Sequence, residues 1–273
     1  MRIGIIGSGS ASLELPQHFY DGVSHQPGVA VELVNPRLSI FAFTAYERLL
    51  VDVGYVDAVQ SAEAAGCDAV VINSFADYGI EAARAVAGIP IVGAGEAALL
   101  AAQAYGSSFC ILTVWPESMR FLYDERLQRL GLTEQCSAIL HFSAEEELGR
   151  LTDDSGVMSR MSRHDGETIT LLREARDRLI ARYAPASIVL GCTCMAPIGP
   201  ALAADSAVPV LESSRIALQQ ALDQLHRVNS AVPAAKTRRP ELVPAMVSAW
   251  VDAPTASAPP ATSDCPVCIV DVE

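Results

Sequence analysis

The segment Leu190-Gly-Cys-Thr-Cys-Met195 contains the residue best suited to proton transfer, Cys192. It follows a short apolar run and precedes a turn-and-helix segment beginning at Ala196-Pro197. At such a strand end, backbone N–H groups and the positive end of a helix face the sulfur, and both favour the reactive thiolate. Cysteine is also a small hydrophobe that packs into cores, so residue type alone leaves a structural role open. Cys194 is interpreted as structural.

The strand end before Cys192 has a counterpart 118 residues earlier, at Ser74. Each is preceded by an apolar run and followed, after a helix-length gap, by a second run of the form Ile/Val-Pro-Ile/Val. These second runs, Ile89–Val92 and Val208–Leu211, are offset by 119 residues, so one insertion brings the two halves into register. The repeat predicts two similar lobes facing each other, with Ser74 and Cys192 at equivalent positions and a cleft between them.

Short β-rich runs alternate with Ala-rich helical stretches along the chain, which is typical of an α/β protein with parallel strands. The predicted strands are Arg2–Ile6, Val29–Val34, Asp68–Asn73, Ile89–Val92, Phe109–Val114, Ser137–His141, Ser187–Leu190 and Val208–Leu211. The predicted helices are Tyr46–Ala65, Gly79–Ala87, Gly95–Tyr105, Glu117–Leu130 and Thr168–Tyr183. Their apolar residues recur at helical spacing. Most strands run into a short loop, where α/β folds usually place their chemistry.

The predicted fold class is α/β, with two pseudo-symmetric Rossmann-like lobes, parallel four-stranded sheets and a cleft between them. We assign residues 1–98 and about 208–228 to the first lobe and residues 99–207 to the second. Residues 230–273 are rich in Ala, Pro, Ser and Thr and are predicted to form a flexible tail. Within this tail, Val243–Val251 has the composition of one short helix.

The bulk composition excludes several classes of function. The net charge of −13 opposes binding to nucleic acid or to an anionic membrane surface, but it leaves a small-molecule substrate possible. No apolar run approaches the ~18 residues that a membrane span requires, and the start MRIGIIG lacks the features of a signal peptide. The seven cysteines are therefore interpreted as reduced thiols in a cytoplasmic protein.

Two further motifs have weaker interpretations. The run Gly7-Ser-Gly-Ser-Ala-Ser12, with Glu32 downstream, is a loose match to a dinucleotide-binding fingerprint, but Ser12 replaces the third glycine. We interpret this loop, including Ser8, as one that closes over a substrate. Cys265 and Cys268 have the spacing of half a zinc site or a redox pair, but no second pair of ligands is evident, and no metal site is predicted.

The run VVINSFADYGIEAARAVAGIPIVGAGEAAL, together with ASIVLGCTCM downstream, resembles the aspartate/glutamate/hydantoin racemase superfamily over roughly residues 1–225. The resemblance implies two pseudo-symmetric α/β lobes and no metal or organic cofactor. It also implies one cysteine per lobe on opposite faces of the substrate α-carbon. One thiolate removes the α-proton and the other thiol protonates the carbanion from the far side. Cys192 matches the second of these cysteines, and homo-oligomers are common in the family.

The position of the first family cysteine falls on Ser74, in INSFADYG. A hydroxyl is a far weaker acid than a thiol, which titrates near pH ~8.5, so serine alone is a poor general base. Three alternatives follow. Ser74 is activated by Asp77 or Tyr78; or Cys192 acts alone, as in the arylmalonate decarboxylases; or the site binds a ligand without catalysis.

The resemblance also suggests binding residues. Thr193 is placed to hold a substrate carboxylate or imide, Asn73 and Phe75 flank Ser74 at the pocket, and Thr113 ends a strand near the substrate. Trp115 is expected either to line the pocket or simply to pack against other side chains.

In glutamate racemases a histidine assists the second cysteine, whereas Cys194 stands at that position here. His141 and His164 are the candidates to replace it, although each is interpreted first as a surface or core residue. Glu96 is interpreted as a first-turn helix residue. The sequence thus predicts a racemase-type isomerase acting on an amino acid or hydantoin derivative, with a malonate-type decarboxylase or a silent binding protein as alternatives.

Overall fold

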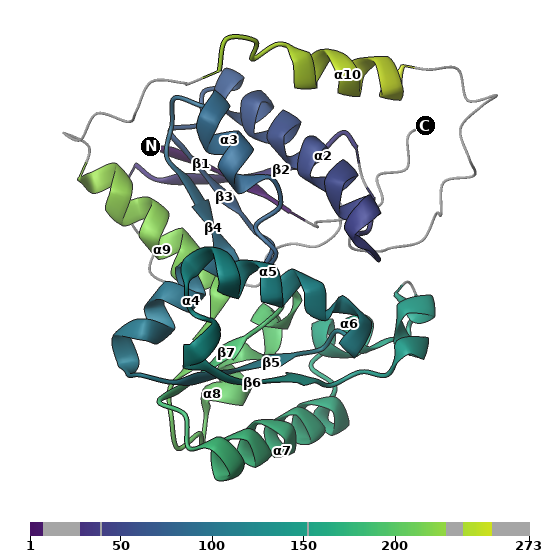
Figure 1. Cartoon of the computed structure of the whole chain (residues 1–273), viewed down its shortest axis with the longest axis vertical. Helices are drawn as coiled ribbons and strands as arrows, with labels where there is room; N and C mark the ends of the chain where they lie inside the picture. Colours follow the sequence, from purple (N-terminus) through teal and green to yellow (C-terminus); the bar gives the residue numbers. More distant parts are fainter. Residues whose placement is uncertain (8–27, 39, 152, 228–236, 253–273) are drawn as a thin grey trace.

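Two parallel four-stranded sheets form the centre of the molecule (Figure 1). The computed structural model describes residues 1–7, 28–38, 40–151, 153–227 and 237–252. The first sheet has the strand order β2-β1-β3-β4 and the second has the order β6-β5-β7-β8, so the two sheets have the same topology. Their strands are β1 Arg2–Ile6, β2 Ala30–Val34, β3 Ala69–Ile72, β4 Ile91–Gly93, β5 Phe109–Thr113, β6 Cys136–His141, β7 Ser187–Leu190 and β8 Val210–Glu212. The α/β class and the two-lobed architecture are confirmed.

Helices cover both faces of each sheet. The described helices that follow or precede the strands are α2 Ala45–Ala64, α3 Ile80–Val86, α4 Ala94–Tyr105, α5 Phe121–Leu130, α6 Val157–Ser162, α7 Gly166–Tyr183, α8 Gly199–Ala203 and α9 Ser213–His226, and a further helix is α10 Leu242–Val251. Short 3₁₀ turns are η1 Glu117–Arg120, η2 Thr133–Gln135, η3 Glu145–Arg150 and η4 Thr193–Ile198. Every predicted strand matches an observed one within two residues at either end. Strands buried on both faces read as continuous Val/Ile/Leu runs, which explains this agreement.

In the first lobe, alternate residues of the strands pack against different helices. Ile6 and Ile72 pack with α2 and α3 on one face, whereas Ile3, Ile5 and Val71 pack with α4 and α9 on the other. On the helical side, the two cores contain many alanines, among them Ala62, Ala83, Ala97 and Ala221. Because alanine is small, these helices lie close to the sheet.

The second lobe repeats this arrangement. Ile111 and Val189 pack with α4 and α5 on one face, and Cys110, Leu112 and Leu190 pack with α6, α7 and η4 on the other. Helix α4 contributes to both lobes, because its Ala94 and Ala97 join the first core and its Leu99 and Ala102 join the second. This shared helix fixes the lobes relative to each other.

Two predicted boundaries differ from the structure. The segment at 208–212 was assigned to the first lobe, but β8 pairs in parallel with β7 and forms the edge of the second sheet. Only α9, which follows it, packs on the first lobe. The short helix predicted at Val243–Val251 is present as α10, which lies against α2 (Figure 1), so only the prediction of a flexible tail is wrong for residues 237–252. Gln60 of α2 donates a hydrogen bond to Pro240 O at 2.9 Å, and Arg37 joins Asp57 of α2 to Ser248 of α10.

Within the described residues, no helix combines the length and apolar character needed to span a bilayer.

Candidate active site

A pocket lies between the lobes, where the carboxyl ends of the strands of both sheets meet. Segments after β1, β2 and β3 line it from the first lobe, and segments after β5 and β7 line it from the second. Open α/β sheets bind ligands at this edge because the loops there converge and leave backbone groups free. The described lining residues are Gly7, Asn35, Pro36, Leu38, Ile40, Phe41, Ala42, Val51, Tyr55, Ser74, Phe75, Ala76, Tyr78, Trp115, Met119, Leu122, Tyr123, Met158, Gly191, Cys192, Thr193 and Cys194.

Ser74 and Cys192 both line this pocket, each at the carboxyl end of the third strand in its sheet's chain order. Ser74 follows β3 by two residues and Cys192 follows β7 by two residues. The hydroxyl oxygen of Ser74 accepts a hydrogen bond from Ala76 N at 3.3 Å. The structure therefore brings the two sequence-predicted proton-transfer residues to one cavity from opposite lobes.

Cys192 is joined to Cys194 by a disulfide bond. The prediction that the cysteines are reduced is wrong for this pair. Cys194, which was interpreted as structural, lines the pocket together with Cys192. Cys192 is the N-cap of η4, and the first turn of that 3₁₀ helix brings residue i+2 back beside it. The backbone N–H of Cys194 donates to the sulfur of Cys192 at 3.2 Å.

Thr193 and Asn73 connect the two strand ends directly. The hydroxyl of Thr193 donates a hydrogen bond to the backbone oxygen of Asn73 at 3.1 Å. Thr193 lines the pocket, whereas the described lining does not include Asn73. The side-chain oxygen Oδ1 of Asn73 is buried, and no described group donates a hydrogen bond to it. Asn73 thus serves the contact between the lobes rather than the cavity wall.

Thr113 supports the pocket from behind. It is fully buried, and its Oγ1 lies 2.5 Å from the hydroxyl of Tyr123, which donates to Gly191 O at 2.9 Å. Burial raises the pKa of Tyr123 above its usual range, so this phenol stays protonated and acts as a donor. Tyr123 lines the pocket and packs against Phe75 of the other lobe, with ring centroids 5.4 Å apart. These hydrogen bonds hold the backbone of Gly191 in place, immediately before Cys192.

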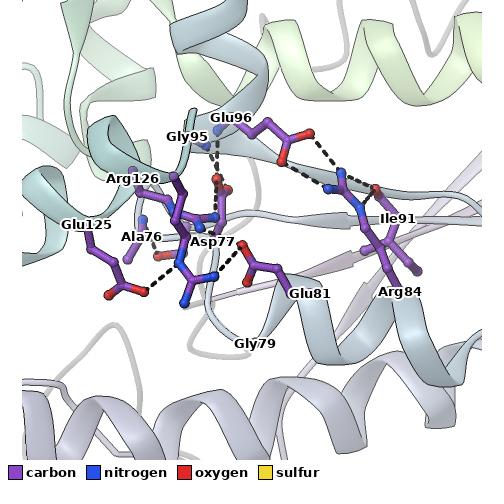
Figure 2. Close-up of polar contacts among 12 residues, drawn as sticks. Ala76, Asp77, Gly79, Glu81, Arg84, Ile91, Gly95, Glu96, Glu125 and Arg126 are labelled. Carbon is purple, nitrogen blue, oxygen red and sulfur yellow. Dashed lines mark hydrogen bonds and ion pairs between the residues drawn. The ribbon is translucent and has the colours of Figure 1, made fainter. Parts of the chain in front are cut away.

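The carboxylate of Asp77 holds the loop that carries Ser74. Both oxygens accept hydrogen bonds from the start of α4, from Gly95 N at 2.9 Å and Glu96 N at 2.7 Å (Figure 2). Asp77 has a φ of +48°, an uncommon conformation outside glycine, and its backbone N–H donates to Ser74 O. The carboxylate is therefore occupied by α4, and the alternative in which Asp77 activates the hydroxyl of Ser74 has no support in these contacts.

Arg126 of α5 completes this network from the second lobe. Its Nη1 lies 3.5 Å from Asp77, and its Nη2 donates to Glu81 of α3 at 2.7 Å (Figure 2). The side chains of Arg126 and Asp77 are 1% and 0% exposed. Burial raises the pKa of Asp77 to about 7, opposed by the charge of Arg126 and the two backbone N–H donors. Sequence reasoning did not identify these ion pairs of Arg126, because its helix is amphipathic and carries no motif.

The remaining predicted residues lie around or outside the pocket. Trp115 lines it and packs against Phe41 in a tilted arrangement, with ring centroids 5.2 Å apart. Neither His141 nor His164 belongs to the described lining; their ring nitrogens bond to Trp115 O and Pro197 O, each at 3.0 Å. Glu96 lies in the first turn of α4, as predicted, and pairs with Arg84 at 3.0 Å (Figure 2).

Two of the motifs singled out above, and one predicted residue within the first of them, fall outside the described residues wholly or largely. These are Ser8, most of the Gly7–Ser12 loop, and the Cys265 and Cys268 pair.

The described lining of the pocket contains no charged side chain and is rich in aromatic residues. Its polar groups are the hydroxyls of serine, threonine and tyrosine, the amide of Asn35, the indole N–H of Trp115, the sulfurs and the backbone. An ionic ligand buried here would lose hydration without gaining an opposite charge from these residues, which is costly. The described part of the lining therefore offers a ligand apolar contacts and a few hydrogen-bonding groups.

A sequence model of the Asp/Glu/hydantoin racemase family matches residues 3–221. The chain belongs to the Asp/Glu/hydantoin racemase family. It is 27% identical over 218 residues to the hydantoin racemase of Paenarthrobacter aurescens, an alignment that covers 78% of this chain and 86% of the relative. Both motifs that line the pocket, around Ser74 and around Cys192, lie within the matched range.

Solved structures of an allantoin racemase and of an arylmalonate decarboxylase have a similar fold. The allantoin racemase from Klebsiella pneumoniae is similar with a TM-score of 0.70 and 24% identity, over 85% of this chain and 89% of that one. A Gly74Cys mutant of arylmalonate decarboxylase is similar with a TM-score of 0.58 and 19% identity, over 86% and 97% of the two chains. At these identities the likeness concerns the fold alone.

Proposed function

We propose that this racemase-family protein moves a proton at the α-carbon of a neutral, cyclic, hydantoin-type amino acid derivative. The observation that carries the proposal is the shared pocket of Ser74 and Cys192, reached from equivalent strand ends of opposite lobes. Groups on opposite faces of a carbon can remove a proton on one side and return it on the other.

The polarity of the pocket selects among substrates. A free amino acid carries an ammonium and a carboxylate, and the described lining offers neither an acidic nor a basic side chain to pair with them. A hydantoin ring is uncharged and presents carbonyl oxygens and N–H groups, which hydroxyls and backbone groups can satisfy. Its α-carbon lies next to a ring carbonyl, so the carbanion is delocalised onto oxygen. The backbone N–H of Thr193 is the proposed donor to that ring, because the hydroxyl proton of Thr193 is donated to Asn73 O.

In the reduced protein, the thiolate of Cys192 is the proposed base. The N–H of Cys194, which points at this sulfur, stabilises the anionic form. Ser74 is the proposed proton donor on the opposite face. Its Oγ accepts from Ala76 N–H, which leaves the hydroxyl proton free and stabilises negative charge on the oxygen after transfer. Because serine is a poor base, proton removal from its side is the slow step.

A second candidate is a decarboxylase of a malonate-type acid, supported by the serine at the first-lobe position and by the fold shared with arylmalonate decarboxylase. Loss of carbon dioxide creates the carbanion without a base, so Cys192 alone would suffice as the acid. This candidate requires the described uncharged lining to accept a dianion.

The test is proton exchange with solvent by the fully reduced protein in deuterated water, followed by NMR and polarimetry. The panel contains amino acids, 5-substituted hydantoins and substituted malonates, each with a control lacking protein. The proposal expects deuterium at C5 of a hydantoin together with loss of optical rotation. Deuterium uptake only from a malonate, with carbon dioxide release, would establish the decarboxylase. Binding of a hydantoin without exchange would indicate a binding protein without this catalytic activity.

We further propose that the protein acts on this small molecule in the cytoplasm.

A further inference from the structure

The sulfur proposed to move the proton is covalently occupied in this structure. Cys192 and Cys194 form a disulfide, with Cα atoms 5.1 Å apart, inside the usual range for such a bond. Both residues line the pocket and also pack on the core of the second lobe, so the bond lies where the cavity wall meets that core.

The other cysteines in the described part of the chain lack this combination. Cys67, Cys110 and Cys136 are free thiols. Burial raises the pKa of each, to about 11 for Cys110 and about 12 for Cys136, so they remain protonated and unreactive near neutral pH. Among the five described cysteines, the two that are paired are therefore also the two that a small molecule entering the pocket would meet.

We propose that Cys192 and Cys194 form a reversible redox site that switches the proton-transfer chemistry off, with a low-molecular-weight disulfide as oxidant and the corresponding thiol as reductant. This inference rests on the proposed role of Cys192. A sulfur in a disulfide carries no proton and no thiolate charge, so it can serve neither as acid nor as base. Cys194, which is bonded to Cys192 in this structure, supplies the resolving thiol.

The exchange proceeds in two steps. The Cys192 thiolate attacks one sulfur of the small disulfide, a mixed disulfide forms, and the first small thiolate leaves. The Cys194 thiolate then attacks the sulfur of Cys192, the internal disulfide forms, and the second small thiolate leaves. The protein loses two electrons and two protons, and the small disulfide becomes two thiols. Attack by two small thiols reverses both steps.

The position of the pair makes the redox reaction compete with the substrate. Cys192 is 7% exposed and Cys194 is partly buried. Both residues line the cavity that the ligand would fill. A bound hydantoin would cover both sulfurs. Ligand binding is therefore expected to slow both formation and reduction of the disulfide.

The experiment incubates the full chain with oxidised glutathione and reduced glutathione at graded ratios. At each ratio, free thiols are alkylated, the peptide containing residues 192–194 is analysed by mass spectrometry, and hydantoin exchange is measured. The wild type is expected to lose two hydrogen atoms in this peptide and nearly all exchange activity in parallel, and dithiothreitol should restore both. The Cys136→Ser control, which removes a described free thiol, should behave like the wild type.

The Cys194→Ser variant separates an internal disulfide from a simple block of Cys192. It is expected to accumulate a glutathione adduct on Cys192 in place of the internal bond. Absence of the 192–194 disulfide in the wild type at every ratio would overturn the redox site. A wild type that keeps its exchange activity with the pair fully oxidised would overturn the switch. Failure of the proposed function is seen separately, as absence of exchange in the fully reduced wild type.

Discussion

Replacing Arg126 with methionine removes a buried cation that joins the two lobes. The guanidinium faces Asp77, which is fully buried, and Glu81, which is about half exposed. Methionine retains most of the apolar volume of the side chain but leaves the carboxylate of Asp77 without an opposite charge. Breaking a buried ion pair from one side costs about 3–5 kcal/mol of unfolding free energy. Asp77 keeps its two backbone donors from α4 and can become neutral by binding a proton, so we expect less than this range, about 2 kcal/mol at about pH 8.

The loss of unfolding free energy caused by Arg126→Met should increase with pH. The folded pKa of Asp77 is raised to about 7, above its ordinary value in an unfolded chain. The native protein therefore binds more protons than the unfolded chain between these values, and its stability falls as pH rises through that window. Without Arg126 the carboxylate is still harder to ionise. Near pH ~5.5 Asp77 is neutral in both proteins, and the variant should lose only about 1 kcal/mol, from the contact with Glu81.

Urea unfolding followed by circular dichroism, at about pH 5.5 and about pH 8, measures both quantities. The matched control is Arg129→Met, because Arg129 also contacts Glu81, at 3.4 Å, but is 50% exposed. A surface pair of this kind contributes about 0–1 kcal/mol, with little pH dependence in this window. Equal losses for the two variants, or a loss at Arg126 that does not grow with pH, would refute the reasoning.

Two further substitutions test the geometry of the site. Ser74→Cys supplies a thiol on the face opposite Cys192. The rate of hydantoin racemisation, measured by polarimetry, should rise by at least about tenfold, because a competent base replaces a poor one. A folded variant without any gain would show that Ser74 does not face the substrate carbon. Gly95→Ala adds a methyl group that collides with the carbonyl oxygen of Phe75 in the Ser74 loop. It should cost about 1–3 kcal/mol in urea unfolding and lower turnover, because the loop must move; Gly131→Ala meets no atom within 4 Å and, although its positive φ is mildly unfavourable, should leave turnover unchanged.

The strands and most helices follow from local patterns in the sequence. Apolar runs such as Phe109–Thr113 and Ser187–Leu190 are buried on both faces, so composition alone marks them. The equivalence of Ser74 and Cys192 also follows, because the repeat places both at the same point in each lobe. The family match extends the argument from these two segments to residues 3–221.

The parts that sequence reasoning missed depend on contacts between distant segments. Asp77 caps α4 through Gly95 and Glu96, and Arg126 reaches it from another lobe, so no spacing rule links them. Strand β8 was assigned to the wrong sheet because its apolar run fits either edge, and only its pairing with β7 decides. The bond between Cys192 and Cys194 depends on the tight turn of η4, which the sequence did not indicate.

The most direct measurement of the central claim compares fully reduced wild type with Cys192→Ala in deuterated water, with a single enantiomer of a 5-substituted hydantoin that the wild type turns over. The account predicts deuterium uptake at C5 by the wild type and uptake at the spontaneous rate by the variant, with both proteins unfolding at similar urea concentrations. A folded Cys192→Ala variant that exchanges the C5 proton as fast as the wild type would contradict it.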